Sequence, residues 1–536
     1  MKDTSKKPFY ITTPIYYPNG KFHIGTAYTT HLADTLKKYK QQRDYDVYMS
    51  TGNDEHGQKI QDTAIENGKT PQEFVDIQAE YSKKLWKELK IDYDFFVRTS
   101  DEPHKEIVQK IFTYFKEKGD IYIGKYKGNY CKSCESYFTD AQAVDKKCPD
   151  CGKDTKNMEE EAYFFNMKKY VPQLLDYYEK HPDFILPESR KNEIVNNFLK
   201  PGLEDLCVTR TSFDWGVKLK EDPKHVIYVW LDALTNYITL LGYGKKGIGL
   251  DKTEETEQFQ RYWPASVHIV GKDIIRFHGI YWPIFLMALG LELPKHILAH
   301  NWYIMKDGKM SKSKGNVIYP EQISREYGTD VLKYMLVTQM PYTHDGVFTA
   351  ESFVTTYNNE LSNDFGNLIH RTIGMVKKYN LVNESKLEYS KYVDKELEQQ
   401  VLQTVKDFEE SFEVFMIQKA KDILWQQISN TNKYIDLIKP WELYKEGKTE
   451  ELNKFIFNIY NVLRIVNILI KPLLPDTYLK MQQILNFTDE QLKYTAEFKF
   501  EDIQINPLLD AEPLFNRLDK TEIDKILEIL KSNSQN

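Results

Sequence analysis

Hydrophobic and polar positions follow two different periods in the first part of the chain. Residues 9–17, "FYITTPIYY", and residues 45–52, "YDVYMSTG", form short apolar runs that predict buried strands. Between them, residues 26–43 repeat apolar side chains at helical spacing, which predicts an amphipathic helix. The two patterns alternate again over residues 225–305. Strands that alternate with helices predict an α/β fold with a doubly wound parallel sheet of the Rossmann type.

This alternation is interrupted over residues 118–224, where glycines, tyrosines and cysteine pairs replace the periodic pattern. We interpret this segment as an insertion between the two halves of the sheet. From residue 350 onward only helical periodicity remains, with breaks at prolines, which predicts an all-α helix bundle. The predicted divisions are a first half-sheet, the insertion, a second half-sheet and the bundle, at residues 1–117, 118–224, 225–349 and 350–536.

The most apolar stretch runs from Phe455 to Pro475. Arg464 and three asparagines interrupt it, so a buried helix is expected there and not a membrane span. The 536 residues carry a formal net charge of -7, which argues against a chain-wide polyanion binder but leaves room for a local basic groove. The opening "MKDTSKK" leads directly into the first strand without a secretion signal, so we expect a cytoplasmic protein.

Four of the five cysteines form two Cys-x-x-Cys pairs, Cys131 with Cys134 and Cys148 with Cys151. Two such turns offer four thiolates, the tetrahedral environment of structural zinc. We therefore predict one structural zinc ion, with no open position for catalysis. Two disulfides or a redox dithiol are the alternative, which is uncommon in a long chain without a secretion signal. The unpaired Cys207 is expected in the core.

Two polar segments follow predicted strands in the two halves of the sheet. In "PNGKFHIGTAY", His23 and Gly25 open a helix, where free N–H groups and the helix dipole favour an anion. In "DGKMSKSKGN", residues 307–316, three lysines lie between two glycines. Taken singly, the first segment is compatible with a surface histidine and the second with a solvated turn. Together they predict a site for a triphosphate, because the carboxyl ends of parallel strands meet at one edge of a sheet.

These segments resemble the two signature motifs of class I aminoacyl-tRNA synthetases, "HIGT" at 23–26 and "KMSKS" at 309–313. Together with "TGNDEHGQKI", "IYVWLDALTNY" and "VGKDIIRFHGIYWP", they are similar to the methionyl-tRNA synthetases over nearly the entire chain. The resemblance implies that L-methionine and ATP, with Mg²⁺, form methionyl-adenylate and pyrophosphate, and that the methionyl group then passes to tRNA(Met).

The resemblance also implies which residues act on ATP. His23, Lys309 and Lys312 would be catalytic, the lysines by neutralising charge on the leaving pyrophosphate. The implied ATP-binding residues are His23, Gly25, Thr26, Lys309, Met310, Ser311, Lys312 and Ser313. Thr26 departs from the family pattern, because a second histidine commonly stands at that position. Its hydroxyl can donate a hydrogen bond but carries no charge, so an account that needs two histidines does not apply directly.

For the methionine site, the resemblance implies that Asp54 pairs with the substrate's ammonium group and that Arg210 helps to hold the site. The residues implied to line the side-chain slot are Ile15, Tyr17, Trp230, Ala233, Tyr237, Ile274, His278 and Trp282. An unbranched thioether suits such an aromatic lining, because sulfur packs well near ring edges. Plain core packing is the alternative for Trp230 and Trp282, and a helix cap or a surface salt bridge is the alternative for Asp54.

In the predicted bundle, "NDFGNLIHR" and "IKPWELYK" resemble the anticodon-reading elements of the family. Asn367 and Arg371 are four residues apart and would share a helix face. Trp441 follows a proline at a predicted helix start, and polar donors beside an aromatic ring suit splayed bases. A tryptophan buried between helices is the alternative interpretation of Trp441.

We therefore expect a monomeric enzyme with a zinc-bearing insertion, which binds methionine, ATP and tRNA and no membrane. One rival interpretation is a class I synthetase for another apolar amino acid. Those for isoleucine, valine and leucine carry a much larger editing insertion than residues 118–224 can provide. A rival of a different class is a zinc-ribbon RNA-binding module on an inactive nucleotide-binding fold. The intact "KMSKS" and Asp54 argue against that second rival.

Overall fold

The computed structural model describes residues 5–132, 136–138, 143–149, 151–305, 308–309, 317–341, 344–382 and 385–532. The chain forms two compact units. The first unit consists of Met1–Phe22 and Asp46–His300, and the second of His23–Tyr45 and Asn301–Asn536.

The first unit is built on a six-stranded sheet in which every pair of neighbouring strands is parallel. The strands, in spatial order, are β3 (Phe95–Arg98), β2 (Asp46–Asn53), β1 (Pro8–Tyr16), β11 (Val267–Gly271), β12 (Ile297–His300) and β7 (Ile185–Leu186). β1 lies between β2 and β11, so the order reverses there, as in doubly wound folds. The α/β fold with a parallel sheet is thus confirmed, with β1 and β2 close to their predicted bounds.

The helices of the first unit are α2 (Gln58–Glu66), α3 (Pro71–Glu88), α4 (Glu102–Glu117), α5 (Val171–Lys180), α6 (Glu188–Ile194), α7 (Val229–Thr239), α8 (Glu257–Tyr262) and α9 (Trp282–Leu289). Helix α3 shows how local sequence sets a start: Thr70 and Glu73 form a capping box, and Pro71 occupies the first turn. The apolar run at 225–234 is mostly helix α7, preceded by the short strand β10 (Val226–Ile227).

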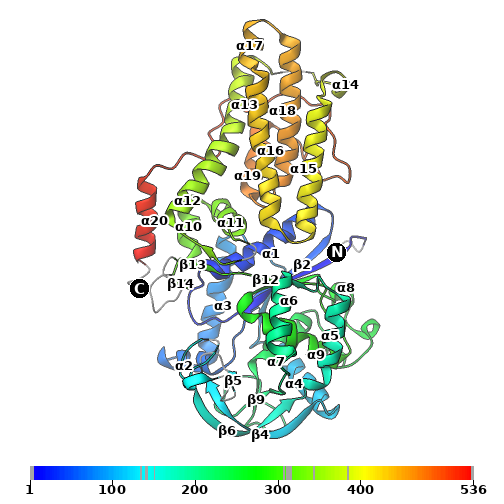
Figure 1. Ribbon diagram of the computed structural model, residues 1–536, viewed down its shortest axis with the longest axis vertical. Helices are drawn as coiled ribbons and strands as arrows, with labels where there is room; N and C mark the ends of the chain where they lie inside the picture. Colours follow the sequence, from blue (N-terminus) through cyan, green and yellow to red (C-terminus); the bar gives the residue numbers. More distant parts are fainter. Residues whose placement is uncertain are drawn as a thin grey trace. The chain divides into compact units, whose positions relative to one another are not determined.

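Residues 118–224 contain a separate antiparallel sheet within the first unit (Figure 1). Its strands, in order, are β5 (Ser136–Phe138), β4 (Ile121–Cys131), β6 (Lys156–Phe165) and β8 (Leu206–Cys207), and β9 (Thr209–Arg210) pairs with β10 beside it. In the sequence, β7 lies between β6 and β8, so residues 118–224 also contribute an edge strand to the parallel sheet.

The second unit begins with α1 (Ile24–Gln42) and a small sheet of β14 (Gly308–Lys309), β13 (Tyr303–Met305) and β15 (Gly346–Val347). Its other helices are α10 (Pro320–Tyr327), α11 (Thr329–Thr338), α12 (Ala350–Thr356), the π-helix Tyr357–Gly366, α13 (Asn367–Lys378), α14 (Tyr389–Tyr392), α15 (Lys395–Glu413), α16 (Ile417–Ile438), α17 (Pro440–Lys445), α18 (Thr449–Ile470), α19 (Pro475–Leu485) and α20 (Thr521–Ser532).

The predicted helix bundle is present, with α13, α15, α16 and α18 side by side (Figure 1). Pro440 and Pro475 open helices, and Pro472 follows the end of α18, so the three prolines mark helix breaks. Every residue of Phe455–Ile470 is buried, which confirms a core helix in the most apolar stretch. Among the residues that the structure describes, no helix is long and apolar enough to cross a membrane.

Candidate functional sites

The residues predicted to bind the substrate come to one edge of the parallel sheet. Ile15 and Tyr17 lie at the end of β1, Asp54 follows β2, and Ile274 and His278 follow β11. These three strands are neighbours, with β1 in the middle. Ligands of doubly wound folds bind outside the carboxyl ends of strands at such a reversal of strand order. The topology therefore supports a single site in the first unit.

Helix α7 and a π-helical turn supply the aromatic side chains of this site. Three of the predicted residues lie on α7, namely Trp230, Ala233 and Tyr237. The turn Phe277–Tyr281 is π-helical, an uncommon conformation that is frequent at functional sites. It stacks the Phe277 ring on Trp230, with ring centroids 3.7 Å apart and planes 7° apart. We call Trp230, Tyr237, Phe277, His278 and Trp282 the aromatic cluster.

The hydroxyl of Tyr237 hydrogen-bonds to the ring of His278, with 2.8 Å between Oη and Nε2. The other ring nitrogen of His278, Nδ1, lies 3.0 Å from the carbonyl oxygen of Ile274. Burial lowers the pKa of His278 to about 4, so the ring is neutral near pH 7. A carbonyl oxygen only accepts, so Nδ1 carries the proton, and Nε2 accepts from Tyr237.

Trp282 is fully buried and donates its indole N–H to Nε2 of His268 at 3.1 Å. Its ring centroid lies 5.9 Å from that of Tyr237. Trp282 is therefore packed in the core and also contacts Tyr237, another member of the aromatic cluster. His268 was not among the predicted residues, and nothing in its local sequence sets it apart from other residues of a buried strand.

Asp54 follows β2 and interacts electrostatically with Tyr237 of the aromatic cluster. Its backbone N–H donates to the carbonyl of Tyr16 at 2.9 Å, which fixes the segment after β2 against the end of β1. The pKa of Tyr237 is raised chiefly by burial, and the negative charge of Asp54 raises it further. Asp54 is half-buried, and its charge acts on Tyr237 of the aromatic cluster.

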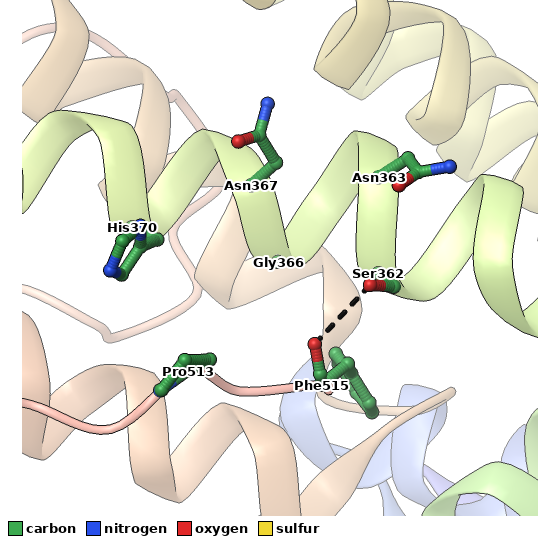
Figure 2. Close-up of a pocket in the computed structure, with 7 residues that line it drawn as sticks. All are labelled: Ser362, Asn363, Gly366, Asn367, His370, Pro513 and Phe515. Atoms are coloured by element: carbon green, nitrogen blue, oxygen red, sulfur yellow. Dashed lines mark hydrogen bonds between the residues drawn. The ribbon is translucent and has the colours of Figure 1, made fainter. Parts of the chain in front are cut away.

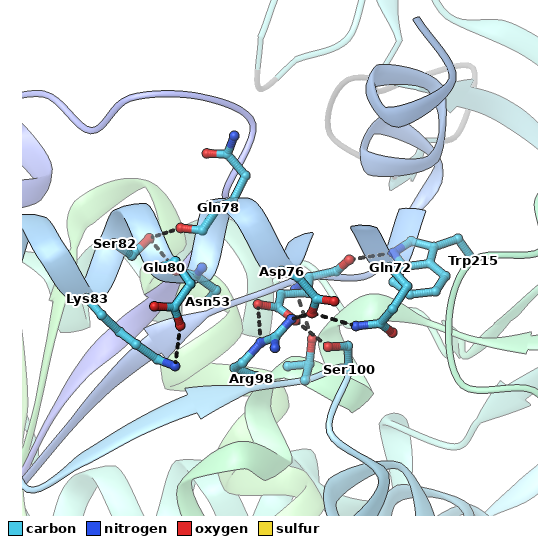
Figure 3. Close-up of polar contacts among 12 residues, drawn as sticks. Asn53, Gln72, Asp76, Gln78, Glu80, Ser82, Lys83, Arg98, Ser100 and Trp215 are labelled. Atoms are coloured by element: carbon cyan, nitrogen blue, oxygen red, sulfur yellow. Dashed lines mark hydrogen bonds and ion pairs between the residues drawn. The ribbon is translucent and has the colours of Figure 1, made fainter. Parts of the chain in front are cut away.

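Glu55, the next residue, is completely buried and paired with Arg98. Figure 3 shows Arg98 close to Ser100. Arg98 Nε donates to both carboxylate oxygens of Glu55, at 2.9 and 3.1 Å, and Ser100 donates to the same carboxylate. The indole N–H of Trp215 donates to the Glu55 carbonyl at 2.5 Å. Burial raises the pKa of Glu55, while the bonds from Arg98 and Ser100 oppose that rise. These contacts hold the segment that carries Asp54.

A second buried group holds the other side of this segment. His56 Nδ1 lies 2.6 Å from one carboxylate oxygen of Asp232 on α7, and His104 Nε2 lies 2.8 Å from the other. Burial alone would raise the pKa of Asp232, but the two histidines lower it to about 2. An ionised Asp232 therefore joins the loop of Asp54 to the helix of Tyr237. In "GNDEHG", the sequence analysis predicted a role for Asp54 but not for Glu55 or His56. Three consecutive ionisable residues after a buried strand could have indicated that all three are functional.

Arg210 contacts the start of α7. It is buried, and its Nη1 donates to the carbonyl oxygens of Thr209 at 2.8 Å and of Cys207 at 3.3 Å. Its guanidinium carbon lies 4.4 Å from the ring centroid of Tyr228, the residue before α7. Arg210 thus supports the helix that carries Trp230.

Tyr17 contacts residues of α2 and α3, and Ile15 pairs with β2. Tyr17 packs with Trp215 against an apolar cluster of α2 and α3, and Lys59 Nζ lies 5.6 Å from its ring centroid. Ile15 is the register partner of Gly52 on β2. Both residues therefore stand next to the segment that carries Asp54.

In the second unit, His23 caps the start of α1. Its Nδ1 accepts a hydrogen bond from the backbone N–H of Gly25 at 3.0 Å, so the proton of a neutral ring is on Nε2. A Cβ at Gly25 would lie 2.8 Å from the His23 ring, so glycine is needed for this cap as well as for a close approach of a ligand. Thr26 lies in the same first turn, which contains no acidic residue. The turn therefore has the polarity that an anion prefers.

For the lysine-rich motif, the structure describes only the backbone of Lys309. This residue ends β14 and pairs with Ile304 of β13. Met310, Ser311, Lys312 and Ser313 lie outside the described residues, and their roles stay predictions.

Three of the four predicted zinc ligands come together. The sulfur atoms of Cys131, Cys148 and Cys151 all lie within 4.8 Å of one another, and those of Cys131 and Cys151 are 3.5 Å apart. Tetrahedral zinc with Zn–S bonds of about 2.3 Å places its sulfurs roughly 3.8 Å apart. No disulfide joins these three cysteines, which does not support the disulfide alternative. Cys134 lies outside the described residues, and Cys207 is buried as expected.

The predicted anticodon residues lie in the second unit, on α13 and α17. Asn367 lines a cavity of about 330 Å³ (Figure 2). The cavity is lined by Ser362, Asn363, Gly366, Asn367, His370, Pro513 and Phe515. Arg371, one turn further along α13, donates from Nη2 to Asp436 at 2.7 Å. Trp441 is half-buried, so part of its ring is accessible, unlike a fully buried tryptophan between helices.

Comparison with known proteins gives consistent matches along the chain. The family described as tRNA synthetases class I (M) matches residues 9–160 and 153–373, and the anticodon binding domain of methionyl tRNA ligase matches residues 388–528. The methionine–tRNA ligase of Bacillus subtilis (strain 168) is 48% identical over 529 residues, which cover 96% of this chain and 78% of that protein. That of Caldanaerobacter subterraneus subsp. tengcongensis is 47% identical over 99% of this chain and 81% of that protein.

A solved structure shows the same fold. Mycobacterium tuberculosis methionyl-tRNA synthetase, in complex with methionyl-adenylate, matches with a TM-score of 0.88 and 34% sequence identity over 95% of this chain and 100% of that chain. Both the catalytic unit and the helical unit are therefore accounted for by one family. The chain belongs to the methionine–tRNA ligases of the class I tRNA synthetases.

Proposed function

We propose that the aromatic cluster and Asp54 bind the methionine that this ligase activates. The enzyme joins L-methionine to ATP to give methionyl-adenylate and pyrophosphate, and then transfers the methionyl group to tRNA(Met). The observation that carries the assignment is the topology, which brings Asp54 after β2 and His278 of the aromatic cluster after β11 to the same edge of the sheet, on either side of β1. Methionine offers the matching groups, an ammonium at one end and an apolar thioether at the other.

The neutral state of His278 matters for this assignment. A charged imidazolium would repel the substrate's ammonium and would need a counter-ion in an apolar site. With His278 neutral, we assign the pairing with the substrate's ammonium to Asp54. The thioether packs against ring edges, which suits a polarizable sulfur.

For the chemical step, His23, Gly25, Thr26 and the lysines of the "KMSKS" motif are proposed to bind ATP. The methionine carboxylate attacks the α-phosphorus, a bond to its oxygen forms, and the bond to the pyrophosphate oxygen breaks. Such a displacement needs positioning and charge stabilisation more than covalent help. With its Nδ1 accepting the Gly25 N–H, His23 is proposed to donate from Nε2 to a phosphate oxygen. Mg²⁺ on the ATP, the catalytic roles of Lys309 and Lys312, and the part of Thr26 remain predictions.

For tRNA, we propose that Asn367, Arg371 and Trp441 read the anticodon in the helical unit, residues 350–536. Asn367 is exposed at the rim of a cavity that contains amide, imidazole and aromatic groups, which suit the edges and faces of unstacked bases. Arg371 can exchange its exposed ion pair with Asp436 for a contact to RNA, because surface ion pairs contribute little.

For the insertion, residues 118–224, we propose that Cys131, Cys134, Cys148 and Cys151 hold one structural zinc ion. Three sulfurs already at ligand spacing support it. The metal would tie the end of β4 to the loop before β6, and no reaction step involves it. A cytoplasmic location and a monomeric state are also predictions.

The proposed methionine site is tested by Asp54→Asn in methionine-dependent ATP–pyrophosphate exchange. Loss of a charged hydrogen bond to the ammonium should raise the methionine KM roughly 10- to 150-fold. The ATP KM should change little. Glu66→Gln is the matched control, since Glu66 is an exposed carboxylate at the end of α2 in the same unit. An unchanged methionine KM in Asp54→Asn would remove Asp54 from the site.

A further inference from the structure

A loop of the insertion contacts Asp54–Gly57, which we call the Asp54 segment. Trp215 of this loop forms two hydrogen bonds with the segment, one on either side of His56. Its indole N–H donates to the carbonyl of Glu55 at 2.5 Å, and its own carbonyl accepts from the N–H of Gly57 at 3.1 Å. The Trp215 ring also meets the His56 ring edge-on, with the ring centroids 5.4 Å apart. The insertion thus binds the backbone directly beside Asp54.

Gln61 on α2 holds the backbone of the same loop. Its side-chain oxygen accepts from the N–H of Asp214 at 3.1 Å and from the N–H of Trp215 at 2.9 Å. Helix α2 begins directly after Gly57, whose carbonyl accepts from the Gln61 N–H at 3.2 Å. The hydrogen bonds therefore form a closed ring, which runs from the Asp54 segment through Gln61 to Trp215 and back to the segment.

The loop is also anchored to β10, the short strand before α7. The carbonyl of Val217 accepts from the N–H of Ile227 on β10 at 2.7 Å. A Cβ at Gly216 would lie 2.3 Å from a side-chain carbon of Val226, so glycine is needed for this close packing. The loop therefore connects the Asp54 segment with the start of the helix that carries part of the aromatic cluster.

We propose that Trp215 and Gln61 are positioning residues for methionine, which set the place of the Asp54 carboxylate relative to the aromatic cluster. The inference rests on the proposed methionine site. The contacts of the Asp54 segment with β1 and β3 hold it from the side of the parallel sheet, whereas Trp215 holds it from the insertion. Neither positioning residue needs to touch the substrate.

The expected consequence concerns one substrate. The attraction between a carboxylate and an ammonium group depends on their separation, so a displaced Asp54 pairs less well with the amino group of methionine. ATP is proposed to bind through other residues, so its KM should not depend on Trp215. A positioning role therefore predicts a change in the methionine KM at a nearly constant ATP KM and kcat.

The first test is Trp215→Phe, which keeps an aromatic ring but removes the indole N–H. In ATP–pyrophosphate exchange we expect the methionine KM to rise roughly 3- to 10-fold, as for the loss of one hydrogen bond. Trp425→Phe is the matched control in the second unit, where the indole N–H of Trp425 donates to the carbonyl of Glu360 at 3.1 Å. This control loses the same kind of bond and should keep the wild-type methionine KM.

Gln61 gives a second pair of variants that leaves the tryptophan in place. Gln61→Met removes the oxygen that accepts the two N–H groups of the loop, so the methionine KM should rise as in Trp215→Phe. Gln61→Glu keeps an accepting oxygen and should restore most of the wild-type value. Equal methionine KM values in the two Gln61 variants would contradict a role through this oxygen.

A double-mutant cycle decides whether Trp215 acts through Asp54. If it does, Trp215→Phe should raise the methionine KM less than about twofold in the Asp54→Asn background, because the charge that it positions is already gone. An equal fold increase in both backgrounds would overturn the inference. So would a lower melting temperature of Trp215→Phe with an unchanged methionine KM, which is the result of a purely structural role.

The same measurements separate this inference from the proposed function. An unchanged methionine KM in Asp54→Asn would count against the proposed methionine site and, with it, against the role of Trp215. A raised methionine KM in Asp54→Asn, together with an unchanged one in Trp215→Phe and Gln61→Met, would overturn the inference alone and leave the proposed site in place.

Discussion

Arg98 Nε donates to both carboxylate oxygens of Glu55, at 2.9 and 3.1 Å. Glu55 directly follows Asp54, the residue proposed to bind the ammonium group of methionine. Glu55 has no exposed surface, so its charge depends on this partner. Arg98→Met would leave a buried carboxylate without its cation. We expect the free energy of unfolding to fall by about 3–5 kcal/mol, and the methionine KM to rise because the Asp54 segment loosens.

Asp76→Asn is the matched control for Arg98→Met. Asp76 is the exposed partner of Arg98, at 2.6 Å from Nη2, so its loss should change stability by less than about 1 kcal/mol. Thermal melting and methionine-dependent exchange measure both effects. Equal melting temperatures for the wild type and Arg98→Met would show that the Glu55 pair does not hold this segment.

The cysteine cluster makes a prediction about metal content. Protein purified without chelator should contain one zinc ion per chain, and Cys148→Ser should lose it, because the remaining ligands no longer complete a tetrahedron. Cys207→Ser, at another buried cysteine outside the cluster, should keep the metal. Metal analysis by mass spectrometry measures all three proteins. A zinc-free wild type, or equal zinc in both variants, would be incompatible with the proposed site.

Substitutions of Trp441 should affect tRNA charging but not the activation of methionine. If its ring stacks on an anticodon base, Trp441→Ala should raise the tRNA KM roughly 5- to 150-fold, and Trp441→Phe should recover part of this loss. ATP–pyrophosphate exchange should stay near the wild-type rate in both variants. Leu437→Ala, at an exposed apolar residue near the end of α16, is the control. Normal aminoacylation at low tRNA concentration in Trp441→Ala would exclude the residue from the anticodon site.

His31 on α1 predicts a pH-dependent stability. It is buried, and within the described part of the chain neither ring nitrogen has a hydrogen-bond partner. Burial, aided by the charge of Lys333, lowers its pKa from 6.5 to about 3. Below pH 6.5 the unfolded chain therefore binds a proton that the folded protein does not, so stability falls as the pH falls toward 3.

At pH 5 this effect amounts to about 2 kcal/mol. His31→Leu removes the titrating group, so its melting temperature should drop less between pH 7.5 and pH 5 than that of the wild type. Melting curves at a series of pH values test this. A steeper or identical decline in the variant would contradict the neutral, buried state of His31.

The sequence predicted those elements whose signal is local. The buried strands β1 and β2 and the bundle helices follow from short apolar runs and from helical periodicity. The hydrogen bonds of His268 and Asp232 could not be predicted, because each is a polar residue whose partners lie on other strands or helices. Their roles depend on the register of β1 with β11 and on the packing of α7.

The π-helical turn before α9 was also missed, since residues 277–290 have an unbroken helical pattern. Pro283 has no N–H to donate to the carbonyl of Gly279, and the hydroxyl of Tyr178 donates to that carbonyl instead. This departure from the regular helix coincides with the placement of Phe277 and His278 in the aromatic cluster. The hydrogen bond from Tyr178 comes from α5, about a hundred residues away in the sequence, so the local sequence could not predict it.

Amino-acid-dependent ATP–pyrophosphate exchange tests the central claim most directly. We expect exchange with L-methionine to exceed that with L-leucine roughly 10- to 200-fold in kcat/KM, because a site shaped for a linear side chain rejects a γ-branched one. Homocysteine, one methyl shorter, should be activated more readily than leucine. Equal exchange with methionine and leucine, or exchange with neither, would contradict the assignment.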